Sequence, residues 1–299
     1  MPHLKGRLIR AGCAALATAG LALGFAGGAA AEYPVVYNFP AAVAATEAGQ
    51  PLTGADDWSC KPTAEHPNPV VLVPGLTGNS RRDYMATAPL LANNGYCVFA
   101  YDFSDDGFQS SATAAAGLAD LVDRVLAATG AEKVDLVGHS QGGMMPRYYM
   151  KFLGGANKVR TLVGISPLSH GTTLFGVATL AQQVAPARDA VAGHCPACAE
   201  DTAGSDFMQQ LNDGGDTLPG VRYTVIGTRY EDIITPYESQ FMSGRQVTNI
   251  LLQDQCRLDA VDHLASTYDS IALRDVLNAL DPAHARTPDC HPVLPGVGG

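Results

Sequence analysis

The sequence predicts an α/β fold with a mostly parallel central sheet and helices on both of its faces. Short apolar runs alternate with segments whose apolar residues recur at helical spacing, and one run ends in a glycine-rich turn around a serine. The chain has 299 residues, of which 46% are hydrophobic and 16% are charged, which excludes a disordered chain or a coiled coil. A chain of this length can bury an ample core.

The predicted elements alternate in order from residue 70 onward. Short apolar runs bounded by turn residues predict strands at residues 70–73, 97–101, 134–137, 162–165, 223–226 and 247–252. Helical patterns occupy residues 83–93, 114–129, 141–153 and 266–280. Pro146 lies near the start of the third predicted helix and weakens it locally.

Residues 167–219 interrupt this alternation and form a long insertion that is rich in Gly, Ala and Thr. An insertion of this kind beside a sheet edge is often a lid or a binding loop. Its first part carries large apolar residues that fit either a groove or lid lining or simple packing on the sheet: Leu168, Leu174, Phe175, Val177 and Leu180. Its acidic residues are interpreted as solvated loop carboxylates rather than as a calcium site: Asp201, Asp206, Asp213 and Asp216.

The first 31 residues predict a signal peptide. A basic start precedes an apolar run over residues 11–26, and residues 29–31 are the small alanines that a signal peptidase accepts. The run is shorter than the roughly 20 residues that cross a bilayer, and Cys13 lies too early in it for a lipoprotein. We expect a secreted, extracellular protein with no membrane span, whose residues 32–299 form a single domain.

The net charge argues against a nucleic-acid partner, and the cysteine content predicts disulfides. The net charge is −10, so the chain lacks the excess of cations that a nucleic-acid partner requires. Six cysteines follow the predicted signal peptide, and an even number in an exported protein predicts disulfides. The sequence does not select one pairing, and we expect the sequential one: Cys60–Cys97, Cys195–Cys198 and Cys256–Cys290. A zinc or redox role for the Cys195–Cys198 pair is disfavoured, because no second CxxC is present.

The segment Gly138-His139-Ser140-Gln141-Gly142 fits the pattern G-x-S-x-G. It follows a predicted strand and precedes a predicted helix, which is the context that gives the motif its meaning. A sharp turn there would hold Ser140 above the sheet, and side chains at Gly138 or Gly142 would strike the neighbouring strand and helix. We interpret Ser140 as a nucleophile, and the alternative is a plain glycine-rich turn.

A serine hydroxyl is a weak nucleophile near neutral pH and needs a base that is itself oriented by an acid. His263 follows the last predicted strand, as the base should, whereas the other histidines precede the acid region, lie inside the turn or belong to the tail. The acid should follow the strand at 223–226, where Glu231 and Asp232 are adjacent. Residue type favours Asp232, because its shorter side chain is the commoner choice.

Negative charge that develops on a carbonyl oxygen requires preset N–H donors. One donor is expected from the residue after the nucleophile, Gln141, and the other from the loop after the first strand. In that loop, residues 74–79, we nominate the N–H of Leu76. Without its position in the fold, this stretch would be an ordinary Gly/Pro turn.

Four segments together resemble the class 2 lipases of the α/β-hydrolase superfamily: Ala55-Asp56-Asp57-Trp58-Ser59-Cys60-Lys61-Pro62, Val71-Leu72-Val73-Pro74-Gly75, Gly138-His139-Ser140-Gln141-Gly142 and Thr235-Pro236-Tyr237. The resemblance spans about residues 55–285. It implies an α/β-hydrolase fold with a lid-like insertion and a secreted carboxylic ester hydrolase, typically a triacylglycerol lipase or esterase. It also implies a lipid or ester substrate and no cofactor. We further expect contact with a lipid interface, a monomer and no bound metal. Ser140 matches the family nucleophile and His263 the family histidine.

The chain departs from the family pattern at two places. The loop after the first strand reads Pro74-Gly75 where the family usually has His-Gly. The acid region in the family often reads Asp-Glu-Val-Val-Thr-Pro, whereas here Glu231 precedes Asp232. Aligned on Thr-Pro, Glu231 takes the place of the usual aspartate, so the resemblance puts Glu231 slightly ahead and both residues stay open.

Other functions remain compatible with these residues. A polyester depolymerase, a cutinase-like enzyme or an acyltransferase could use the same serine, histidine and acid. A non-catalytic binding protein on the same fold would be expected to lack one of the three, and all three are present in order. No feature of the sequence points to peptide bonds as the substrate.

Overall fold

Six parallel strands form one sheet in the order β2-β1-β3-β4-β5-β6 in the computed structural model, which describes residues 32–299. The strands are β1 Val70–Val73, β2 Val98–Ala100, β3 Val134–His139, β4 Val159–Ile165, β5 Arg222–Gly227 and β6 Val247–Leu251. The predicted fold class is confirmed. The predicted signal peptide, residues 1–31, lies outside the described residues.

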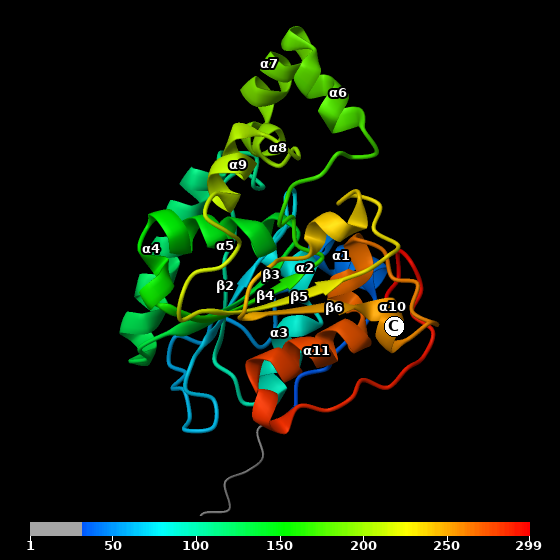
Figure 1. Cartoon of the computed structure of the whole chain (residues 1–299). Coiled ribbons are helices and arrows are strands. Elements are labelled where there is room, and N and C mark those ends of the chain that lie inside the picture. The colour runs from blue at the N-terminus through cyan, green and yellow to red at the C-terminus, as the bar shows by residue number, and fades with distance from the viewer. Residues whose placement is uncertain (1–31) are drawn as a thin grey trace, which may run out of the picture. The chain divides into compact units, whose positions relative to one another are not determined.

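Helices cover the sheet on both faces (Figure 1), and strands β1 and β2 are continuous apolar runs, as expected for strands in such a sheet. Alternate residues of β1 point to opposite sides of the sheet. Val71 and Val73 pack in the core beneath helices α4 (Ser111–Thr129) and α5 (Gln141–Phe152), and Val70 and Leu72 pack in the core beneath α3 (Thr87–Asn93) and α11 (Ser270–Leu280). All four side chains are fully buried.

Two predicted helices have other boundaries in the structure. The helix predicted at 83–93 is divided into α2 (Ser80–Tyr84) and α3, and α2 begins where the Asn79 side chain accepts the N–H of Arg82 at 3.0 Å. The closing helix starts at Ser270 rather than at residue 266. Asp269 caps it by accepting the N–H of Ile271 at 2.8 Å, and residues 264–268 form a 3-10 helix instead.

Several helices were not predicted from the sequence. Helix α1 (Phe39–Glu47) precedes the sheet, and α10 (Leu252–Gln255) follows β6. The insertion between β4 and β5 contains four helices: α6 Val177–Gln183, α7 Ala185–His194, α8 Pro196–Glu200 and α9 Asp206–Asn212. Neither α6 nor α7 buries a side chain in the core. No helix of the described chain is both long and apolar enough to cross a membrane.

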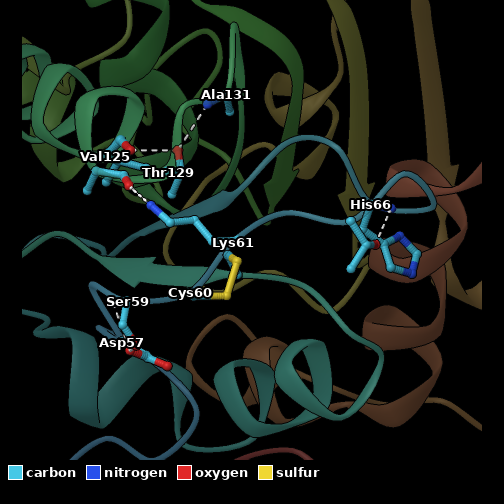
Figure 2. The surroundings of a disulfide bond; sticks show 11 residues. Asp57, Ser59, Cys60, Lys61, His66, Val125, Thr129 and Ala131 are labelled. Carbon is cyan, nitrogen blue, oxygen red and sulfur yellow. Dashed lines mark hydrogen bonds between the residues drawn. A yellow bond between two sulfur atoms is a disulfide. The ribbon is translucent and has the colours of Figure 1, made fainter.

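Three disulfides join the cysteines in the sequential order that was expected from the sequence. Cys60–Cys97 ties the segment before β1 to the residue before β2, and Figure 2 shows this bond beside Lys61, whose ammonium donates to the carbonyl oxygen of Ala128. Cys195–Cys198 closes the junction between α7 and α8. Cys256–Cys290 anchors the C-terminal tail to the segment that precedes His263.

Asp275 of α11 is a buried carboxyl whose pH response can be predicted. Burial raises the pKa of Asp275 to about 6, against smaller lowering effects of hydrogen bonds from Gln255 and Asn278. The folded protein therefore keeps a proton that the unfolded chain loses near pH 3.9, so stability falls as the pH rises from about 4 to 6. We expect Asp275→Asn to increase the free energy of unfolding at pH 8 by about 1–3 kcal/mol and to change it little below pH 4.

Urea unfolding of wild type and Asp275→Asn at both pH values measures this difference. Glu132→Gln serves as the matched control, because Glu132 is an exposed acid. A gain of equal size at both pH values, or no gain at pH 8, would contradict the prediction.

Candidate active site

Ser140 occupies the turn between β3 and α5, with φ 54° and ψ −121°. A positive φ is strained for a residue with a side chain. Hydrogen bonds hold the strained turn in place: the Ser140 N–H donates to the Ile165 oxygen at 3.1 Å, and the Ser140 oxygen accepts the N–H groups of Gly143 at 2.9 Å and Leu168 at 3.2 Å. The backbone thus presents the Ser140 side chain at the carboxyl end of the sheet.

The two glycines of the motif are required by close backbone contacts. A Cβ at Gly138 would lie 1.8 Å from the Gly142 oxygen, and a Cβ at Gly142 would lie 2.0 Å from the Val73 oxygen. Both distances are far below any real contact, so the turn can close only where these side chains are absent. This is the reason for the glycines that was inferred from the sequence.

A cavity of about 430 Å³ opens between this turn and the insertion. Its inner end is lined by Ser140, His263, His139 and the loop residues Gly75, Leu76 and Thr77. Its outer end is lined mostly by small or apolar side chains of α6 and α7, among them Val177, Ala178, Ala181 and Val191. The cavity is therefore suited to a ligand with an extended apolar part.

Glu231 and His263 meet at the wall of this cavity. His263 Nδ1 lies 2.8 Å from Glu231 Oε1, and both side chains are almost fully buried. The same carboxylate oxygen accepts the N–H groups of Ile233 at 2.9 Å and Ile234 at 3.0 Å. Burial alone would raise the pKa of Glu231, but His263 and the two amides lower it by more, so that it lies below its ordinary value. Glu231 is thus ionised at neutral pH.

The Asp232 carboxylate does not contact the His263 ring. The Asp232 side chain is exposed, and its Oδ1 accepts the backbone N–H of His263 at 3.4 Å rather than contacting the imidazole. Of the two carboxylates that the sequence left open, the structure places Glu231 beside the His263 ring. This position agrees with the alignment on Thr235-Pro236 and not with the preference for the shorter side chain.

The loop over residues 74–79 is held at three points. The Gly75 N–H donates to Asp83 Oδ2 at 2.9 Å, the Thr77 N–H donates to the Asp106 oxygen at 2.7 Å, and the Arg82 guanidinium donates to the Thr77 oxygen. Leu76 lines the cavity, and its N–H donates to no acceptor within residues 32–299. The Gln141 N–H belongs to the first residue of α5 and has no acceptor within the helix. Both nominated amides are therefore available as donors.

His139 makes contacts that the sequence did not reveal. Its ring packs against the His263 ring with centroids 4.8 Å apart, and its Nε2 lies 3.0 Å from the His263 carbonyl oxygen. Its Nδ1 lies 3.7 Å from Asp83 Oδ2, the oxygen that also accepts the Gly75 N–H. Asp83 and His139 thus connect the 74–79 loop, the serine turn and the histidine loop.

The four acidic residues that the sequence singled out in the insertion have different surroundings. Asp206 and Asp213 are exposed, Asp201 is buried, and Asp216 pairs with Arg147 at 3.6 Å and with His170 at 3.0 Å. Within the described part of the chain, no group of three or more His, Cys, Asp or Glu side chains is placed to share a metal ion. Cys195 and Cys198 are bonded to each other.

The apolar residues that the sequence singled out in the insertion divide into two groups. Leu168, Leu174 and Val177 line the cavity, and Leu168 is also part of the core. Phe175 and Leu180 do not pack on the sheet, since they are 74% and 62% exposed. Neither of the two expectations for these residues therefore applies to all of them.

The chain is similar to curated sequence relatives, to solved structures and to one family model. Two curated relatives, the triacylglycerol lipases of Pseudarthrobacter phenanthrenivorans and Burkholderia plantarii, are each 42% identical over 88 residues, which is 27% of this chain. The match spans only 27% and 24% of the length of these relatives.

Solved structures share the fold at low sequence identity. Aspergillus fumigatus lipase B has a TM-score of 0.61 and 19% identity, over 79% of this chain and 61% of that chain. The mature form of the Bacillus licheniformis lipase BlEst2 has a TM-score of 0.56 and 19% identity, over 78% of this chain and 96% of that chain. These likenesses support the α/β-hydrolase fold.

The family model described as "Lipase (class 2)" matches residues 67–273. This range takes in all six strands, the serine turn, the Glu231 loop and His263. The chain therefore belongs to the class 2 lipases.

Proposed function

We propose that the protein is a carboxylic ester hydrolase, a triacylglycerol lipase or esterase, that acts through Ser140, His263 and Glu231. The observation that carries this proposal is the buried Glu231–His263 contact of 2.8 Å on the same cavity as the strained Ser140 turn. A nucleophile, a base and an orienting acid in this chain order are the elements of serine-dependent ester hydrolysis. The family membership supports the same reaction class.

In the proposed mechanism, His263 accepts the proton of the Ser140 hydroxyl while its oxygen attacks the ester carbonyl. The N–H groups of Leu76 and Gln141 bind the oxyanion of the tetrahedral intermediate. The intermediate collapses to an acyl-enzyme, and the leaving alcohol takes the proton from His263. Water, deprotonated by His263, then attacks the acyl carbonyl, releases the acid and restores Ser140. Glu231 stays ionised throughout and stabilises the imidazolium.

The surroundings of the site support a lipid-like substrate. The outer cavity wall is mostly apolar, and Phe175 and Leu180 lie exposed on the insertion that forms this wall. We propose that this insertion contacts the lipid interface while an acyl chain occupies the cavity. The three disulfides support export to an oxidising compartment. We propose that residues 1–31 are the signal peptide and that residues 32–299 form one monomeric domain.

Initial rates on esters and triglycerides of increasing acyl chain length, below and above substrate solubility, test the proposal. We expect hydrolysis of both substrate types, and loss of this activity after treatment with a fluorophosphonate. Faster turnover of polyester films than of triglycerides would instead indicate a polyester depolymerase. Preferential transfer of the acyl group to an added alcohol would indicate an acyltransferase. A protein that hydrolyses no ester and forms no fluorophosphonate adduct would be a binding protein.

A further inference from the structure

Asp201 is a buried carboxyl in the cavity wall that the proposed mechanism does not use. It follows α8 in the insertion and lines the same cavity as Ser140. Only 5% of the residue is exposed, and its Oδ1 has no hydrogen-bond partner among the described residues. Burying a polar oxygen without a hydrogen-bond partner costs free energy.

The position of Asp201 is fixed relative to the Glu231 loop. The Asp201 carbonyl oxygen accepts the N–H of Thr172 at 2.9 Å. The Thr172 hydroxyl in turn donates to the Ile233 oxygen at 2.6 Å and accepts the N–H of Thr235 at 3.0 Å. Ile233 and Thr235 belong to the loop whose amides hold Glu231, so Asp201 and the Glu231–His263 pair are joined by a short chain of hydrogen bonds.

The surroundings of Asp201 favour its neutral form. Burial raises the pKa of Asp201 well above its ordinary value, and the neighbouring Glu200 raises it further. Glu200 Oε2 accepts the N–H of Ser111 at 2.7 Å at the start of α4, where the helix dipole stabilises a negative charge. Arg188, the cation of α7 that lines the cavity, is half exposed and contacts Asp189 at 3.0 Å. A protonated Asp201 is a hydrogen-bond donor.

We propose that Asp201 forms a polar subsite that donates a hydrogen bond to the carbonyl oxygen of a second ester group in the substrate. This inference rests on the proposed function and narrows its substrate class to esters that carry a second ester. The second ester belongs to the acyl side in diesters of dicarboxylic acids and to the alcohol side in diacylated diols or glycerols. A site built around a buried polar group discriminates against an analogue that lacks the matching oxygen.

Matched pairs of substrates test this subsite on the purified protein. Diethyl suberate is compared with ethyl octanoate for the acyl side, and ethylene glycol dibutyrate with hexyl butyrate for the alcohol side. We expect wild type to have a kcat/KM about tenfold higher for the diester of one pair, the effect of about one hydrogen bond to a buried group. The pair that shows this preference identifies the side on which the second ester lies.

Variants of Asp201 assign the preference to this carboxyl. Asp201→Leu should lower kcat/KM for the preferred diester relative to its matched plain ester until the ratio of the two approaches one, whatever the absolute rates of the variant. Asp201→Asn retains an N–H donor and should keep most of the preference. Asp213→Asn is the matched control, because Asp213 is an exposed acid of the same insertion, and it should leave the ratio unchanged.

Several outcomes would overturn the inference. They are equal rates within both substrate pairs in wild type, or a preference that persists in Asp201→Leu. If Asp201→Leu does not fold, as judged by thermal unfolding, Asp201→Ala replaces it, because alanine needs no additional space. In each case continued hydrolysis of the plain esters leaves the proposed function intact. Failure of wild type to hydrolyse any of the esters would overturn the proposed function as well.

Discussion

Ser140→Ala should lower kcat/KM for a p-nitrophenyl ester by about 10⁴-fold or more, because the variant retains every proposed element except the attacking oxygen. Alanine adds no atom to the turn, and the hydrogen bonds that hold residue 140 come from its backbone. The fold should therefore be unchanged. Initial rates measure the loss, thermal unfolding checks the fold, and mass spectrometry should find a fluorophosphonate adduct on Ser140 of wild type and none on the variant.

Ser166→Ala is a matched control for this substitution. Ser166 also follows a buried strand, has a positive φ of 43° and is almost fully buried, with a hydroxyl that has no partner among the described residues. Its loss should leave ester hydrolysis within about twofold of wild type, as expected for a side chain outside the site. Substantial turnover by a folded Ser140→Ala protein would refute the proposed mechanism.

Glu231→Gln should lower kcat by about 10³- to 10⁴-fold with little change in KM, whereas Asp232→Asn should change kcat only about twofold. The reason is geometric. The Glu231 carboxylate lies 2.8 Å from His263 Nδ1 and can stabilise the imidazolium, but Asp232 is exposed and accepts a long hydrogen bond from a backbone N–H. Steady-state kinetics of both variants on one soluble ester at neutral pH measure the difference.

These two substitutions control for each other, since the residues are adjacent and each loses one negative charge. The reverse order of effects would assign the acid role to Asp232. Equal and large losses in both variants would mean that the loop conformation, rather than one carboxylate, is required. Because His263 and the two amides hold the pKa of Glu231 below its ordinary value, its charge should persist to a lower pH than that of an ordinary glutamate.

Most of the sheet could be predicted from the sequence because strands β1 to β5 are largely buried. Buried strands are rich in apolar residues, and the mostly apolar run at residues 134–137, which includes Asp135, located β3, although the strand extends to His139. Helices α6 and α7 could not be predicted in the same way, since neither buries a side chain. The start of α2 at Ser80 depends on the Asn79 cap, a local hydrogen bond that the apolar pattern does not report.

The candidate site was predictable only in part. Ser140 is marked by its motif and His263 by its place in the chain order, and both line the cavity. The choice between Glu231 and Asp232 depends on the turn in which two amides bind Glu231, and residue type pointed to the other acid. The contact of His139 with His263 joins residues 124 positions apart, and no local pattern encodes it.

Two points of the insertion between β4 and β5 lie close together, which affects how far the sequence between them can change. Thr172 and Thr202 are paired as an isolated β-bridge, so the chain leaves the body and returns to it at neighbouring points. The tip between them includes α6 and α7, which bury nothing in the core yet supply the outer cavity wall. We therefore expect that residues 177–194 can be replaced by the corresponding segment of a related chain. Such a replacement would change the outer wall of the cavity and leave Ser140, His263 and Glu231 in place.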